Sequence, residues 1–194
     1  MPTYVSVIGP TGIPPLPPIP NVQGPVWTVL LFLYYLNKKS LPDLMDTFST
    51  KGNPAVYPKV GITSYGPQFV GYTAVQRLFR QLLSSFDPIA LTPQGPTDPN
   101  NPGSNWLYNA DDAPVPQIGI QMNFSGVQIG SWFAEGTPNY SPPLSNIVPD
   151  STRAMDLDAS VIFYFDTGND KIVQAAIYFD RYLMSQQLAT ASQR

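Results

Sequence analysis

The chain has 194 residues, of which 43% are hydrophobic and only 12% are charged, and its formal net charge is −3. This composition fits one folded domain with a substantial core, and it argues against wholesale disorder and against the basic surface that nucleic-acid binding requires. The sequence contains neither cysteine nor histidine, which excludes disulfides, Cys- or His-based catalysis and metal sites that use either ligand.

Residues 1–25 form a proline-rich arm, in which residues 14–20 read PPLPPIP. Such a run favours the extended polyproline conformation. It suits an aromatic groove on another protein. The apolar residues around it favour instead an arm that lies against its own domain or against a dimer partner.

No membrane segment or targeting signal is expected. The most apolar stretch, residues 26–36, is shorter than the roughly 20 residues that a bilayer span needs. No Lys or Arg precedes it, as a secretory signal would require. We therefore expect a cytoplasmic protein that has neither a membrane nor a nucleic acid as partner.

Three helices are predicted in the first half of the chain. Residues 26–39 are apolar on nearly every side, which is typical of a buried helix. Residues 41–48 follow Ser40, a plausible N-cap. A third, amphipathic helix of about four turns begins at the capping-box pattern Thr73–Gln76 and ends before Pro88.

The second half is dominated by strands. Residues 117–124 alternate strictly between apolar and polar side chains, which predicts a strand. We expect residues 127–134 to be its partner, with a turn at Ser125–Gly126. Residues 154–165 and 171–182 predict a hairpin, because a connection with Gly and Asn joins two strand-like runs.

Two long proline-rich loops are expected, at residues 88–116 and 137–150, with short strands near residues 55–60 and 89–91. The helices come first and most of the strands follow. This order predicts an α+β fold with the helices on one face of a curved sheet.

Two motifs resemble a known family. Near the C-terminus stand Lys171-Ile172, the aromatic pair Tyr178-Phe179, Asp180 and Gln187-Leu188, while Gly71-Tyr-Thr-Ala-Val75 opens the amphipathic helix. In this pattern the chain resembles SnoaL-like proteins of the ketosteroid-isomerase and nuclear-transport-factor-2-like superfamily.

The resemblance implies a cone-shaped α+β fold. A strongly curved antiparallel sheet would pack on about three N-terminal helices and enclose a mostly apolar pocket. It also implies a homodimer formed through the outer face of the sheet. The expected organisation is an arm at residues 1–25 and a single SnoaL-like domain at residues 26–194, with proline-rich loops that a minimal member lacks.

The resemblance also implies that Asp180 is a catalytic general base. A carboxylate inside an apolar cone is desolvated, which raises the pKa of such a group and makes it a useful base. It would abstract a proton next to a carbonyl in a cyclisation or a double-bond isomerisation. An Asp at a strand end also commonly binds backbone or an arginine, and this structural role stays open.

Five further residues are candidates for substrate binding. Tyr178, Trp132 and Gln174 could stabilise an oxyanion by residue type, although the two aromatic residues are more often plain core. Phe163 and Val161 would belong to the pocket wall. Several SnoaL-like cyclases use a histidine here, which this chain lacks.

Neither a cofactor nor a metal is expected. The sequence has no phosphate-binding glycine loop and no dinucleotide fingerprint. The pair Asp111-Asp112 is more typical of a solvated turn than of a metal site.

The register of the predicted hairpin decides which residues share a face. An even-length loop would pair Ala176 with Val161, so that Gln174, Tyr178 and Asp180 face the pocket. A bulge would reverse this assignment.

Two functions remain open. The first is a cofactor-free isomerase or cyclase that uses Asp180 on a hydrophobic carbonyl compound. The second is a non-catalytic module that binds a small hydrophobic ligand or associates as a homodimer. They differ in whether Asp180 opens into a cavity or is tied to its neighbours.

Overall fold

The computed structural model describes residues 24–50, 52–62, 69–94, 107–109, 116–130, 154–168 and 170–189. The proline-rich arm up to residue 23, Asp111, Asp112 and Trp132 lie outside these ranges. No helix in the described ranges is long and apolar enough to cross a membrane.

Four helices lie in these described ranges, and three of them were predicted from the first half of the sequence. They are α1 (Pro25–Asn37), α2 (Leu41–Asp46), α3 (Tyr72–Ser85) and the C-terminal α4 (Arg181–Ala189). α1 follows Gly24 and α2 follows Ser40, each with proline in its first turn, where a missing N–H does no harm.

The start of α3 differs from the expected capping box. The helix begins after Gly71, and no side chain caps it. Gly71 has φ 89°, and a Cβ there would lie 2.9 Å from the backbone oxygens of both Pro54 and Ala55. Only glycine fits this position, so the Gly71 of the family-like motif is explained by backbone packing.

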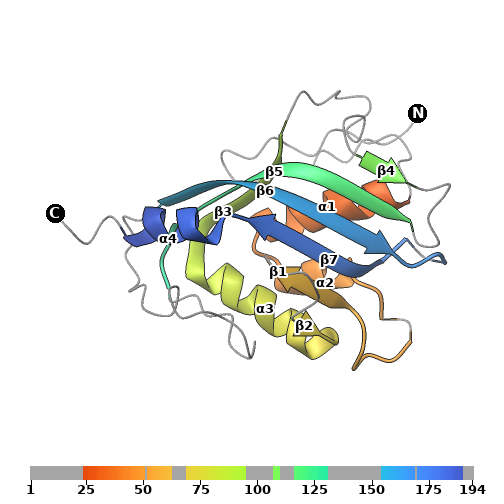
Figure 1. Cartoon of the computed structure of the whole chain (residues 1–194). Helices are drawn as coiled ribbons and strands as arrows, with labels where there is room; N and C mark the ends of the chain where they lie inside the picture. The colour runs from red at the N-terminus through yellow and green to blue at the C-terminus, as the bar shows by residue number, and fades with distance from the viewer. Residues whose placement is uncertain are drawn as a thin grey trace, which may run out of the picture.

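The part of the sheet that the structure describes has seven strands: β1 (Lys59–Ile62), β2 (Phe69–Val70), β3 (Phe86–Pro93), β4 (Leu107–Asn109), β5 (Gln117–Gln128), β6 (Ala154–Phe165) and β7 (Ile172–Phe179). Its order is β2-β1-β7-β6-β5-β3, and β4 also pairs with β5. Figure 1 shows the long strands arching over α1, α2 and α3, which confirms the predicted α+β architecture. One pair departs from the antiparallel pattern, because β1 runs parallel to β7.

The expected turn at Ser125–Gly126 is wrong. β5 runs straight through both residues and pairs with β6 along its length. Gly126 serves a different purpose, since a Cβ there would lie 3.0 Å from the carbonyl oxygen of Pro88. The glycine therefore lets the irregular start of β3 approach β5 closely.

The β6–β7 hairpin contains the bulge that reverses the expected register. A shift between Tyr164 and Phe165 pairs Val161 with Ile177, and Ala176 with Ile162. Because successive side chains alternate between faces, this one-residue change moves Gln174 and Tyr178 to the face opposite the helices. We call the side that faces the helices the inner face and the other side the outer face.

The core lies between the inner face and the helices. Its centre is a phenylalanine cluster formed by Phe32 of α1, Phe48, Phe79 of α3 and Phe163 of β6, each at most 2% exposed. Phe32 touches the other three rings, with centroids 5.1 to 5.9 Å apart. This contact on several sides explains why α1 is apolar nearly all round.

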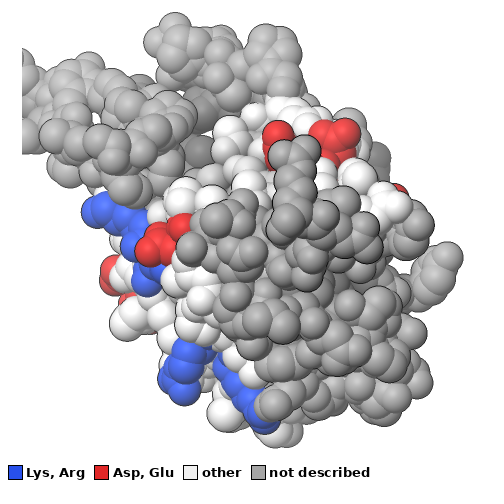
Figure 2. Space-filling view, turned by 90° about the vertical axis from the view of Figure 1, so that its left-hand side faces the viewer, with Lys and Arg blue, Asp and Glu red and all other residues white. Residues whose placement is uncertain are grey.

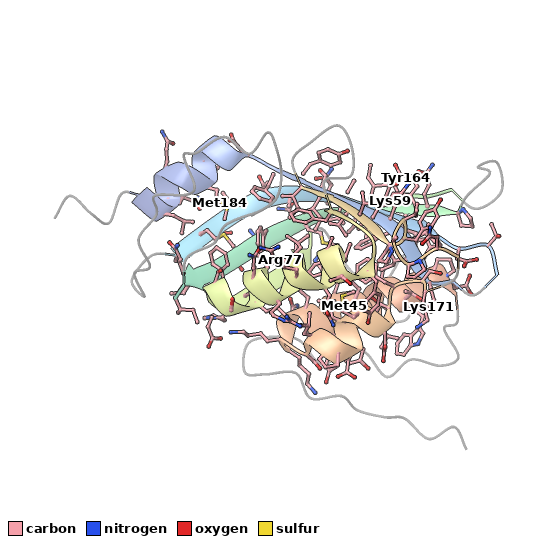
Figure 3. The ribbon with its side chains drawn as sticks, turned by 90° about the horizontal axis from the view of Figure 1, so that it is seen from below. Met45, Lys59, Arg77, Tyr164, Lys171 and Met184 are labelled. Carbon is pink, nitrogen blue, oxygen red and sulfur yellow. The ribbon has the colours of Figure 1, made fainter. Side chains whose placement is uncertain are left out.

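Side-chain amides bind the open edges of two strands. Asn37, at the end of α1, accepts a hydrogen bond from the Leu91 N–H at 2.9 Å and donates one to the Leu91 carbonyl at 3.3 Å. Gln187 of α4 does the same for Asp156, at 2.8 and 2.9 Å. These bonds hold α1 against β3 and α4 against the start of β6, where Met184 enters the core (Figure 3).

Candidate functional site

The two predicted wall residues, Val161 and Phe163, lie on the inner face and are completely buried. The Phe163 ring packs edge-on against Phe32 of α1, at a centroid distance of 5.1 Å. These side chains therefore belong to the packed core between the sheet and the helices.

Gln174 and Tyr178 lie on the outer face, away from Val161 and Phe163. Gln174 stands opposite Tyr164, and Tyr178 stands opposite Ser160. The Tyr178 side chain is 40% exposed. The structure thus divides the predicted substrate-binding residues between two faces of the sheet, and the bulge in the hairpin is the physical cause.

Asp180 is exposed and stands immediately before α4. Its carboxylate Oδ1 accepts a hydrogen bond from the Leu183 N–H at 3.1 Å, and its carbonyl accepts one from the Met184 N–H at 3.0 Å. This is the geometry of a helix N-cap. An exposed cap lacks the apolar surroundings on which the proposed base chemistry depends.

Three buried hydroxyl side chains donate hydrogen bonds to backbone carbonyls. Thr28 donates to the carbonyl of Asp170, Thr47 to that of Leu44 and Ser85 to that of Gln81, each at 2.7 Å. Among the side chains that the structure describes, no Asp, Glu, Lys or Arg is buried. The described interior thus offers apolar contacts and hydroxyl or amide groups.

Among the described tyrosines, the one whose pKa is shifted, Tyr35, lies outside the centre of the core. Tyr35 of α1 is half-buried against α2, and this burial, with the nearby Asp43 carboxylate, raises its pKa. Three or more potential metal ligands do not come together anywhere in the described ranges.

Gln128 is a buried polar residue that the sequence analysis missed. It is 1% exposed and lies at the end of β5, on the inner face. The alternation of Ile118, Ile120, Met122 and Phe124 was the available signal. Continued through Gly126, it places Gln128 inside, whereas the expected turn at Ser125–Gly126 interrupted it.

The outer face carries a row of small or apolar residues across its centre. Gly61, Ala176, Ile162 and Gly119 are neighbours on β1, β7, β6 and β5. Lys59 and Tyr164 belong to the next row, through Gln174, and Figure 3 shows them near one end of the sheet. Two carboxylates, Asp156 and Asp158, lie on the same face toward the other end of β6.

Charge is sparse elsewhere too. On the face that Figure 2 draws, the described Lys, Arg, Asp and Glu side chains form small separate groups. One ion pair within the described ranges joins Lys39 to Asp87 at 3.5 Å. None of these described groups forms the large positively charged patch that binding of a polyanion would require.

The fold is similar to that of several bacterial proteins. A protein from Pseudomonas putida, provisionally assigned as a polyketide cyclase, matches 87% of this chain and 100% of its own at 14% identity, with a TM-score of 0.58. A SnoaL-like protein from Jannaschia with the same provisional assignment matches 84% of this chain and 90% of its own at 11% identity, with a TM-score of 0.57.

An NTF2-like protein of unknown function from Burkholderia pseudomallei matches 87% of this chain and 99% of its own, at 12% identity and a TM-score of 0.56. No protein-family model matches the sequence, and no curated protein matches it. At these identities the likeness establishes the fold alone.

Proposed function

Because the chain has the SnoaL-like fold of the nuclear-transport-factor-2-like superfamily, we propose that it is a non-catalytic binding module, which pairs with a second copy through the outer face of its sheet. The observation that supports this proposal is that the candidate polar residues lie outside the packed interior. Phenylalanine fills the centre of the cone, whereas Gln174, Tyr178 and Asp180 lie outside it.

The interior is suited to stability. In the phenylalanine cluster, Phe32 contacts three other rings edge-on. Such aromatic pairs contribute about 0.5–1.5 kcal/mol each beyond the area they bury. A proton-abstracting site needs a carboxylate beside a bound substrate, and the described interior holds no buried carboxylate.

The outer face is suited to contact with a second copy. Its central row, Gly61, Ala176, Ile162 and Gly119, carries no charge. Gly61 and Ala176 are already buried within the single chain, whereas Ile162 and Gly119 are partly exposed, so that covering them desolvates no ion. Tyr178, beside this row, is the kind of amphipathic ring that interfaces favour. A two-fold pairing uses the same patch on both partners.

The charges on this face support a copy of the same chain as the partner. Lys59 stands at one side of the uncharged centre, and Asp156 and Asp158 stand toward the opposite end. A face that carries both signs at separate positions can meet itself with unlike charges opposed. Such complementarity selects an orientation more than it adds affinity.

The test is the mass of the protein in solution, measured by light scattering after size-exclusion chromatography at about 100 µM. We expect the wild type to be a dimer and Ile162→Lys to be a monomer, because a charge would enter the apolar centre. Thr73→Lys is the control, since Thr73 is exposed on α3, on the helix side of the sheet. A monomeric wild type, or an Ile162→Lys variant that folds and stays dimeric, would contradict the proposal.

A cofactor-free isomerase or cyclase is the second candidate. What favours it is the position of Asp180, which directly follows Phe179. The Phe179 ring lies 5.6 Å from that of Phe124, so the carboxylate stands where the aromatic core meets the surface. In this case the substrate would be a small hydrophobic carbonyl compound, and Asp180→Asn would abolish its turnover while the fold is kept.

A further inference from the structure

Three of the six large apolar side chains that are exposed in the described ranges lie together near β2, the strand at one edge of the described sheet. They are Val56, Tyr57 and Val70, each 37 to 42% exposed. The Lys59 ammonium lies over the Tyr57 ring, 4.9 Å from its centre, and Lys59 pairs with Val70 across β1 and β2. We call Val56, Tyr57 and Val70 the edge patch.

The edge patch is held in place by backbone hydrogen bonds. The N–H groups of Gly71 and Tyr72, at the start of α3, donate to the carbonyls of Pro58 and Pro54 at 2.9 and 3.0 Å. These bonds attach the turn before β1 to the junction of β2 and α3. An apolar surface that is fixed in advance binds a partner without a further cost of ordering its own backbone.

The proline-rich arm joins the domain at the same end of the sheet. A Cβ on Gly24 would lie 3.9 Å from the Asp170 carboxylate, and Thr28 donates to the Asp170 carbonyl at 2.7 Å, so α1 begins beside the residues that precede β7. Because β1 runs parallel to β7, the turn that precedes β1 lies at this end too. Figure 3 shows Lys59 and Lys171 toward this end.

The arm carries an apolar stripe that suits such a surface. Ile13, Leu16, Ile19 and Val22 stand three positions apart, with prolines at most positions between them. A polyproline helix has about 3 residues per turn, so these side chains line one side of it. No Lys, Arg, Asp or Glu occurs in residues 1–25, so the stripe can cover an apolar patch without desolvating a charged side chain.

The length of the arm allows the contact. Val22 stands 2 positions and Ile13 stands 11 positions before Gly24. At the rise of about 3.1 Å per residue in a polyproline helix, these positions reach about 6–34 Å from the start of α1. The edge patch begins two strands away from the hairpin loop at Asp170, since β7 and β1 are neighbours.

We propose that residues 13–22 dock on the edge patch of their own chain as a polyproline helix, with the apolar stripe against Val56 and Val70 and a proline ring against Tyr57. Exposed aromatic rings bind such segments well, because a polyproline helix is preformed and loses little entropy. Since proline has no N–H, the segment covers the edge of the sheet without adding a strand to it. The docking does not depend on pairing through the central row of the outer face.

The test uses a nitroxide label on Thr11→Cys in the full chain, since the sequence has no cysteine of its own. The label broadens the backbone amide NMR signals of the residues that it approaches. We expect the amides of Val56, Tyr57 and Val70 to lose most of their intensity relative to the reduced label. The amide of Ile129, which bonds the end of α3 near the β3 edge, should keep its intensity.

Two variants should abolish the loss of intensity at the edge patch. Tyr57→Ser removes the ring, and Leu16→Ser interrupts the stripe. Ile129→Ser is the matched control for the patch, since Ile129 is 44% exposed elsewhere, and Val7→Ser is the control for the arm. Both controls should keep the loss. No loss at the patch in the wild type, or a loss that survives in Tyr57→Ser, would overturn the proposal. If Tyr57→Ser does not fold, Val70→Thr gives the same comparison.

A mixed sample separates docking within one chain from docking on a second copy. Spin-labelled chains at natural isotope abundance are refolded together with isotope-labelled chains that carry no nitroxide. Unchanged signals at the edge patch would support docking within one chain. Broadening there would show that the arm reaches another copy, which would overturn the proposal.

Discussion

At the scale of a single residue, Asp180 shows how one carboxylate can end a strand and begin a helix. β7 ends at Phe179, and Asp180 accepts the Leu183 N–H that the first turn of α4 leaves without a partner. Its negative charge also lies at the positive end of the helix. Capping therefore explains why an aspartate stands at this position without any catalytic role. The isomerase candidate needs a test of its own.

We predict that Asp180→Ala lowers the free energy of unfolding by about 1 kcal/mol, because alanine cannot cap, while Asp180→Asn leaves it nearly unchanged, because asparagine caps as well. Urea denaturation followed by circular dichroism measures both. Equal losses in the two variants would argue against the cap. A stable Asp180→Asn protein that loses an isomerase activity found in the wild type would favour the enzyme.

The position of Asp180 at a strand end followed from the sequence, but the faces of the hairpin did not. An even-length loop and a bulged strand are both compatible with residues 154–182, and alternation alone does not choose between them. The bulge at Tyr164/Phe165 decided the outcome. For the same reason, Gln174 and Tyr178 could be assigned to a strand and not to a side of it.

At the scale of elements, two helices are fixed to the sheet by amides that imitate a neighbouring strand. Asn37 of α1 bonds both backbone groups of Leu91, and Gln187 of α4 bonds both of Asp156. Unpaired strand edges invite pairing with other chains. Periodicity predicted the helices, whereas these bonds join residues far apart in sequence, and no local pattern reveals them.

We predict that Asn37→Ala lowers the free energy of unfolding by about 1–2 kcal/mol, because the N–H of Leu91 loses its acceptor. Asn37→Asp should lose less, since it keeps that acceptor. Hydrogen exchange at the Leu91 amide should accelerate in Asn37→Ala, and Thr92→Ala, an exposed change on the same strand, is the control. Unchanged exchange at Leu91 would refute the role of Asn37.

At the scale of the whole molecule, apolar packing dominates the described structure and ion pairing contributes little. The phenylalanine cluster joins α1, α3 and β6, whereas the Lys39–Asp87 pair is largely exposed, with the Asp87 side chain 59% accessible. Exposed ion pairs contribute about 0–1 kcal/mol. The low charged fraction thus agrees with a fold whose first three helices and long strands follow from the apolar pattern of the sequence.

We predict that the free energy of unfolding changes by less than about 1 kcal/mol between about 0.05 and about 0.5 M NaCl, because salt screens charges and leaves apolar contacts almost untouched. Urea denaturation at a series of NaCl concentrations measures this. A steady loss of stability with salt would show that ion pairs contribute more than the described structure indicates.

The parallel pairing of β1 with β7 has a consequence for how the protein is made. Lys59 on β1 pairs with Gln174 on β7, more than a hundred positions later, and Phe48 forms an isolated bridge with Ile172. During synthesis, β1 leaves the ribosome long before β7, the strand with which it pairs in parallel. The edge of β1 that meets β7 therefore stays unpaired until the last strand emerges, and such late, non-local pairing slows folding and prolongs the exposure of the edge to aggregation.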